Sequence, residues 1–154
     1  MEQKTKVSAA PNDKGIEILR EFELPVEALF QAFEDPEIFA QWMATEVLHM
    51  ENRKYGSYSF QTKNPQGEIA FRVEGIYHTF LKNQQIIRTF EMIPSSFGVQ
   101  LEHLLFQGID NQHSRLRMQS IFQSSEQRDQ LLKLPFAFGL NLAHHRLQKI
   151  LQTK

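Results

Sequence analysis

The six histidines are the side chains in this sequence with the widest chemical range, because imidazole binds metal ions and exchanges protons near neutral pH. No His-x-x-x-His pair occurs, and the chain has no cysteine that could complete a zinc site. His144 and His145 are adjacent in a predicted helix, where neighbouring side chains point about 100° apart. The sequence therefore predicts no metal site among the six: His49, His78, His103, His113, His144 and His145.

The sequence likewise gives no support for a catalytic nucleophile or for a bound cofactor. No Gly-x-Ser-x-Gly turn is present, and a helix-capping role accounts for Ser124 and Ser125. Neither a Gly-x-Gly-x-x-Gly segment nor a phosphate-binding loop occurs. Without cysteine there is no thiol nucleophile, disulfide or iron–sulfur ligand. We assign no catalytic residue and no cofactor, and binding is favoured over enzyme activity.

Composition bounds the class of protein. With 154 residues, 41% of them hydrophobic, the chain fits one folded domain. A net charge of −1 argues against nucleic-acid binding, and no apolar run approaches the roughly 20 residues that span a bilayer. No secretory signal is visible and cysteine is absent, so we expect a cytoplasmic location. Thirteen phenylalanines against one tryptophan indicate a very full core or a ring-lined cavity.

The N-terminal third predicts an arm, a strand and two short helices. Residues 1–14 are polar and aperiodic, which is typical of a flexible arm or a loosely held edge extension, and 15–154 form one domain. Apolar and acidic residues alternate over 15–24, as in a half-buried strand. Pro25 suits the start of a helix, and Asp35 followed by Pro36 suits the start of a second one, which carries Trp42.

The remainder predicts a strand meander and a closing helix. Short turn signals separate strands, so neighbours pair antiparallel. Ser124 and Gln127 form a capping box before a short helix, and an apolar stripe over 136–152 predicts a long one. The fold class is α+β, with a curved antiparallel sheet wrapped around the C-terminal helix and an internal cavity between them. The predicted strands of the meander are 45–52, 57–63, 68–80, 85–93, 99–109 and 115–123.

Several short motifs follow one another along the chain. They are Phe30-Gln31-Ala32-Phe33-Glu34-Asp35-Pro36-Glu37 with Gln41-Trp42, Arg53-Lys54-Tyr55-Gly56-Ser57-Tyr58, Glu74-Gly75-Ile76-Tyr77, Ile86-Ile87-Arg88-Thr89-Phe90, and Glu126-Gln127-Arg128-Asp129 with Gly139 and Leu147. In order and spacing, these motifs resemble the SRPBCC (START-like) superfamily of helix-grip domains. Within it, the chain is most similar to the domain family named for the activator of the heat-shock-protein ATPase. Two departures are Tyr55 in place of a turn glycine and Phe90 in place of a tryptophan.

This resemblance implies a helix-grip fold over about 15–151, a hydrophobic ligand and a role in stress response. Activation of a chaperone is not expected of this chain, because the protein that gives the family its name also needs a separate N-terminal domain for that activity. Oligomeric state is not indicated.

Strand faces are assigned by placing charged side chains outward. Glu102 then points away from the helix, and His103 points toward it. Gly75, in mid-strand, predicts a bend, and Trp42 closes one end of the cavity. The predicted cavity lining is Trp42, Tyr58, Phe60, Phe71, Val73, Tyr77, Phe90, Leu101, His103, Leu105, Met118, Phe136 and Leu140.

Three functions remain open on this basis. The favoured one is binding of an apolar or aromatic small molecule in the cavity. An alternative is an enzyme of the polyketide cyclase or dehydratase type, with His103 and Tyr77 as its acid–base pair. A third is a protein-interaction module that uses the outer sheet face, which would carry Arg72, Glu74, Glu102, Arg117 and Gln119.

Overall fold

A computed structural model describes residues 4–153, within which eight strands form one antiparallel sheet in the order β1-β2-β8-β7-β6-β5-β4-β3. The strands are β1 Lys6–Ser8, β2 Gly15–Phe22, β3 Glu46–Met50, β4 Ser57–Lys63, β5 Ile69–Leu81, β6 Gln85–Ile93, β7 Val99–Asp110 and β8 His113–Ile121. The helices in this range are α1 Val26–Glu34, α2 Pro36–Met43, α3 Ser125–Leu132 and α4 Phe136–Gln152.

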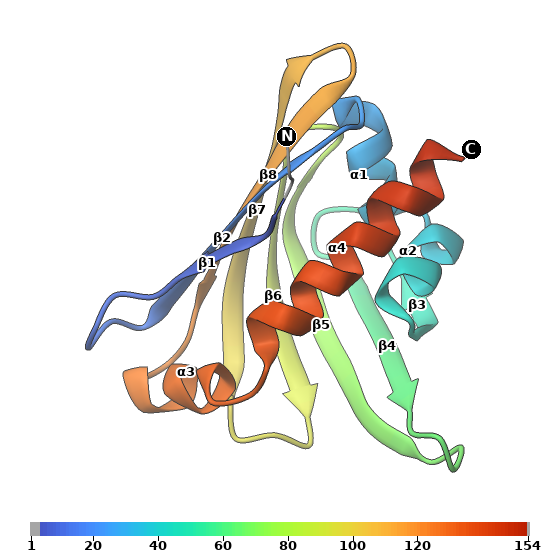
Figure 1. The fold of residues 1–154 in the computed structure, drawn as a ribbon. Coiled ribbons are helices and arrows are strands. Elements are labelled where there is room, and N and C mark those ends of the chain that lie inside the picture. Colours follow the sequence, from blue (N-terminus) through green and yellow to red (C-terminus); the bar gives the residue numbers. More distant parts are fainter. Residues whose placement is uncertain (1–3, 154) are drawn as a thin grey trace.

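The sheet curves around α4, which runs across one face from α3 toward α1 and α2 (Figure 1). Strands β3 to β8 are joined in sequence as a meander, and β8 returns beside β2. Helices α1 and α2 carry the chain from β2 to β3 at the opposite edge of the sheet. This is the predicted α+β helix-grip architecture, confirmed with two short helices after the first long strand.

The predicted N-terminal arm contains an additional strand. Residues 1–3 of the arm and Lys154 of the predicted domain lie outside the described residues. From Lys6 to Ser8 the chain pairs antiparallel with β2, with Val7 opposite Ile18, so this part is an edge extension of the sheet. Three residues are too few to show a period, which is why the sequence did not separate the strand from the arm.

Local signals at the helix starts are confirmed. The Asp35 carboxylate accepts hydrogen bonds from the backbone N–H groups of Glu37 and Ile38 at 2.9 and 3.3 Å, as an N-cap should. Ser124 Oγ likewise accepts from the backbone N–H of Gln127 at 3.1 Å. In the described range, no helix is both long and apolar enough to cross a membrane.

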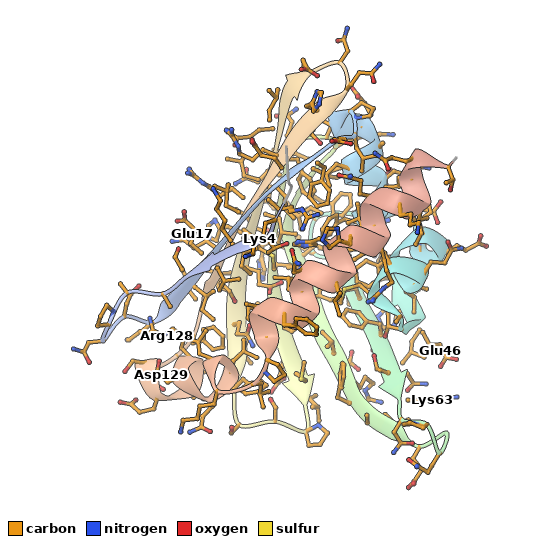
Figure 2. The ribbon with its side chains drawn as sticks, in the orientation of Figure 1. Lys4, Glu17, Glu46, Lys63, Arg128 and Asp129 are labelled. Carbon is orange, nitrogen blue, oxygen red and sulfur yellow. The ribbon has the colours of Figure 1, made fainter. Side chains whose placement is uncertain are left out.

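Helix α3 is tied to the N-terminal loop by a buried arginine. Arg128 Nη1 donates to the backbone carbonyls of Ala10 and Gly15 at 2.7 and 3.2 Å. Its Nη2 donates to Asp129 at 3.0 Å, and Figure 2 labels both side chains on α3. These bonds fix α3 beside the sheet edge and so position one end of α4.

The faces of β7 are the reverse of those predicted. Glu102 is only 4% exposed and shares the inner face with Leu104 and Phe106, whereas Leu101 is 39% exposed on the outer face. Both faces of this strand are apolar, so the charge of Glu102 alone decided the prediction. That charge is held inside because Arg88 lies directly opposite it on β6.

Gly75 is required by close packing. The bend predicted at Gly75 stays a prediction; the register of β5 against β6 shifts further along, between Tyr77 and Thr79. A Cβ at Gly75 would overlap the ring of Tyr58, its cross-strand partner, and the carbonyl oxygen of Thr89. The tyrosine ring therefore occupies the space that a side chain at Gly75 would need.

The turn between β3 and β4 keeps a glycine-like backbone despite Tyr55. This residue has φ of +66°, in the left-handed region that glycine adopts at least cost. Tyr55 therefore changes the side chain at this position, while the backbone of the turn keeps a conformation that glycine would also adopt.

Candidate functional site

A cavity of about 190 Å³ lies between the inner face of the sheet and α4. It separates two hydrophobic clusters: one contains Phe33, Phe39 and Trp42 from α1 and α2, and the other contains Ile16 and Ile18 from β2. Met92 and Met118 pack against both clusters. The apolar lining consists of Ile16, Ile18, Phe33, Phe39, Trp42, Met43, Phe90, Met92, Phe97, Met118, Leu131, Phe136 and Leu140.

The polar part of the lining is concentrated on the sheet. Arg88 on β6 and Glu102 on β7 face each other across the ladder, and the arginine Nε donates to Glu102 Oε1 at 2.8 Å. Arg88 is 6% exposed, and its guanidinium carbon lies 5.1 Å from the centre of the Tyr58 ring. This hydrogen bond uses one donor atom of Arg88 and one oxygen of Glu102. Nη1 and Nη2 of Arg88 and Oε2 of Glu102 take no part in it.

The pKa values of Glu102 and Arg88 are shifted by burial and by the interactions of these side chains with their neighbours. Burial raises the pKa of Glu102, and the nearby Arg88 opposes that rise. For Arg88, burial acts to lower the pKa, but Tyr58, Glu102 and Tyr77 together outweigh it and the pKa ends above its ordinary value. A guanidinium is a permanent cation, and Glu102 is the carboxyl group paired with Arg88 at 2.8 Å.

A second polar pair lies beside the first. Ser120 Oγ on β8 donates to Gln100 Oε1 on β7 at 3.0 Å, and both side chains are buried. This bond orients the Gln100 amide and leaves its Nε2 donor outside the pair. Both residues line the cavity.

His144 supplies the polar group on the helix side. Its Nδ1 lies 2.7 Å from Thr5 Oγ1, and the same hydroxyl oxygen accepts from Arg20 Nη1 at 3.0 Å. Burial, together with the charges of Arg20 and His145, lowers the pKa of His144 to about 3. His144 is therefore neutral at physiological pH.

The structure brings part of the predicted lining together. Trp42, Phe90, Met118, Phe136 and Leu140 line the cavity. Tyr58, Phe60, Val73 and Tyr77 are buried in the adjoining core, and Phe71 packs against it. The three predicted residues of β7 lie on the opposite face of the sheet from the cavity: Leu101, His103 and Leu105.

This placement also separates the proposed acid–base pair. Tyr77 is in the core, whereas His103 is half-buried on the outer face between two inward-facing neighbours, Glu102 and Leu104. The two side chains share no cavity, so the enzyme alternative built on them is wrong in its geometry. The predicted outer face loses Glu102 for the same reason.

The predicted lining omitted thirteen of the residues that line the cavity, and the polar ones among them include Arg88, Gln100, Glu102 and His144. Their spacing from buried neighbours in the sequence indicated that they face inward. Arg88 has the strand period of the buried Ile86 and of Phe90, and His144 follows Leu140 by one helical turn on the apolar stripe of α4. Placing every charged residue outward concealed this signal.

Comparison with known proteins identifies the fold and then the family. A solution structure of a protein from Arthrobacter aurescens aligns with a TM-score of 0.86 at 17% identity, over 97% of this chain and 92% of that one. A crystal structure of a protein from Rhodobacter sphaeroides aligns with a TM-score of 0.87 at 17% identity, over 98% of this chain and 100% of that one. No curated protein matches the sequence. The family described as "Activator of Hsp90 ATPase homolog 1-like protein" matches residues 23–152, and the chain belongs to this family.

Proposed function

We propose that this protein binds a small apolar or aromatic molecule in the cavity between the sheet and α4. The supporting observation is a cavity of about 190 Å³ walled by aromatic rings, aliphatic side chains and three methionines. Methionine adapts its shape to irregular ligands. Hydrophobic ligands are common among domains of this SRPBCC-like fold.

The volume sets the size of the ligand. An apolar cavity of about 150 Å³ admits one benzene molecule and stays dry when empty. The cavity here, about 190 Å³, accordingly suits one ring with small substituents. Filling it restores dispersion contacts that its lining now lacks, and this supplies the free energy of binding.

The methionines allow a site-specific test with toluene as the probe. In protein labelled at the methionine methyl groups, toluene should shift the NMR signals of Met43, Met92 and Met118, which line the cavity. Met50 packs against the core and is not among the lining residues, so it serves as the internal control. Saturable shifts confined to the first three are expected.

Two matched variants on α4 complete the experiment. Leu140→Trp places a larger side chain in the cavity and should abolish the shifts. Leu142→Trp makes the same change at a site 43% exposed and two residues away, and should preserve them. Absence of saturable shifts in the parent protein, or equal loss in both variants, would contradict the proposed function.

A further inference from the structure

We propose that the cavity selects a neutral ring compound bearing a hydroxyl group, and discriminates against both the corresponding carboxylate and the corresponding hydrocarbon. This inference rests on the proposed function and specifies its ligand chemistry. It follows from the paired charges and the remaining hydrogen-bonding atoms of the polar lining.

The balance of charge excludes an anion. Among residues 4–153, the charged side chains in the lining are Arg88 and Glu102, which are paired at 2.8 Å, and His144 is neutral. A carboxylate entering the cavity would find its cation already neutralised and a buried carboxylate beside it, while losing its own hydration.

The nearby cation does not change this balance. Arg20 lies behind His144 and is not part of the lining. Its Nη1 is bonded to Thr5 Oγ1 and Asn141 Oδ1 at 3.0 and 2.9 Å. A ligand in the cavity would have to displace both oxygens to reach Nη1, and Nε, which has no hydrogen-bond partner among the described residues, is itself buried.

The remaining atoms match a group that both donates and accepts. Glu102 Oε2 can only accept, whereas Gln100 Nε2 and the terminal nitrogens of Arg88, whose guanidinium also interacts with the Tyr77 hydroxyl, can only donate. A hydroxyl satisfies both requirements from one atom. A carboxylate cannot donate to Glu102, and a hydrocarbon would leave these polar atoms without a hydrogen-bond partner.

Three probes of matched shape test the proposal: p-cresol, toluene and p-toluate, titrated into methyl-labelled protein and followed at Met43, Met92 and Met118 with Met50 as control. In the parent protein p-cresol should bind about tenfold or more tightly than toluene, as expected for one or two hydrogen bonds to charged partners. No saturation is expected with p-toluate.

The matched variant is Arg88→Met combined with Glu102→Leu. Replacing a buried ion pair with apolar side chains of similar size is often tolerated, so the fold should persist. The preference for p-cresol over toluene should disappear while toluene still binds. If this variant fails to fold, Gln100→Leu leaves the ion pair intact and should lower the ratio of p-cresol affinity to toluene affinity.

The outcomes separate the two proposals. Equal affinity of the parent protein for toluene and p-cresol would overturn the inference and leave the proposed function standing, as would tightest binding of p-toluate. Binding of none of the three probes would overturn both.

Discussion

Replacing Glu102 with leucine should be among the most damaging single changes in this protein, and adding Arg88→Met should reverse most of the damage. Both side chains are almost fully buried, and they meet through a single 2.8 Å contact. Removing one partner leaves an uncompensated charge inside the domain, which costs about 3–5 kcal/mol of unfolding free energy. Removing both replaces the pair with apolar groups of similar volume, and the cost should fall to about 1 kcal/mol or less.

The measurement is urea unfolding at neutral pH, with the free energy of unfolding compared across the parent, both single variants and the double variant. An exposed pair provides the control. Arg72 Nε lies 3.1 Å from Glu74 Oε1, with side chains 47% and 40% exposed, so Glu74→Leu should change stability by no more than about 0.5 kcal/mol.

Two results would refute this reasoning. If Glu102→Leu costs no more than Glu74→Leu, Arg88 reaches solvent or another partner in the variant and its charge is not trapped. If the double variant is as unstable as either single one, the pair contributes through packing geometry, and the charge argument fails.

Further changes test the helix side of the cavity and the glycines. Burial lowers the pKa of His144 to about 3, so the folded state binds a proton less tightly than the unfolded state, and stability should fall as pH drops below about 6.5 by up to roughly 1.4 kcal/mol per pH unit. His144→Gln should flatten this dependence in acid-titrated thermal melts, and His78→Gln, at an exposed histidine, should not. Gly75→Ala should destabilise by about 1–3 kcal/mol in urea unfolding, because its Cβ meets Tyr58; an unchanged midpoint would show that the ring moves aside. Gly139→Ala has open space around it and should instead gain about 0.5–1 kcal/mol from helix propensity, and any loss in the same assay would show that the site is crowded.

Much of the fold was predictable because its signals are local. The bounds predicted for β4 and β6 coincide with the observed ones, since both strands are flanked by strong turn residues. The same holds for the start of α2, where Asp35 caps the helix as expected. Strand β1 was not separable, because its pairing with β2 is a tertiary contact of three residues.

Only part of the candidate site could be predicted from the sequence. The apolar lining and the charged lining differ in this respect for a physical reason. Aromatic and aliphatic lining such as Trp42 and Phe136 follows from periodicity, which sequence shows directly. Arg88 and Glu102 each contradict the rule that charge faces water, and the contradiction is resolved only by knowing that they lie opposite each other. Strand register carries that information, and register is set by the whole sheet.

The position of the ion pair relative to the two hydrophobic clusters argues for a ligand-binding role. A buried pair adds little to stability compared with an apolar replacement, so its presence calls for another consequence. Arg88 and Glu102 lie in the lining of the space between the clusters, where Met92 and Met118 contact both. A ring bound there would contact Trp42 on one side and Ile16 on the other, joining the clusters through its apolar surface while its hydroxyl engages the pair. Because such a ligand binds only the folded chain, p-cresol should raise the melting temperature of the parent protein in proportion to the logarithm of its concentration, and the double variant should lose this advantage of p-cresol over toluene.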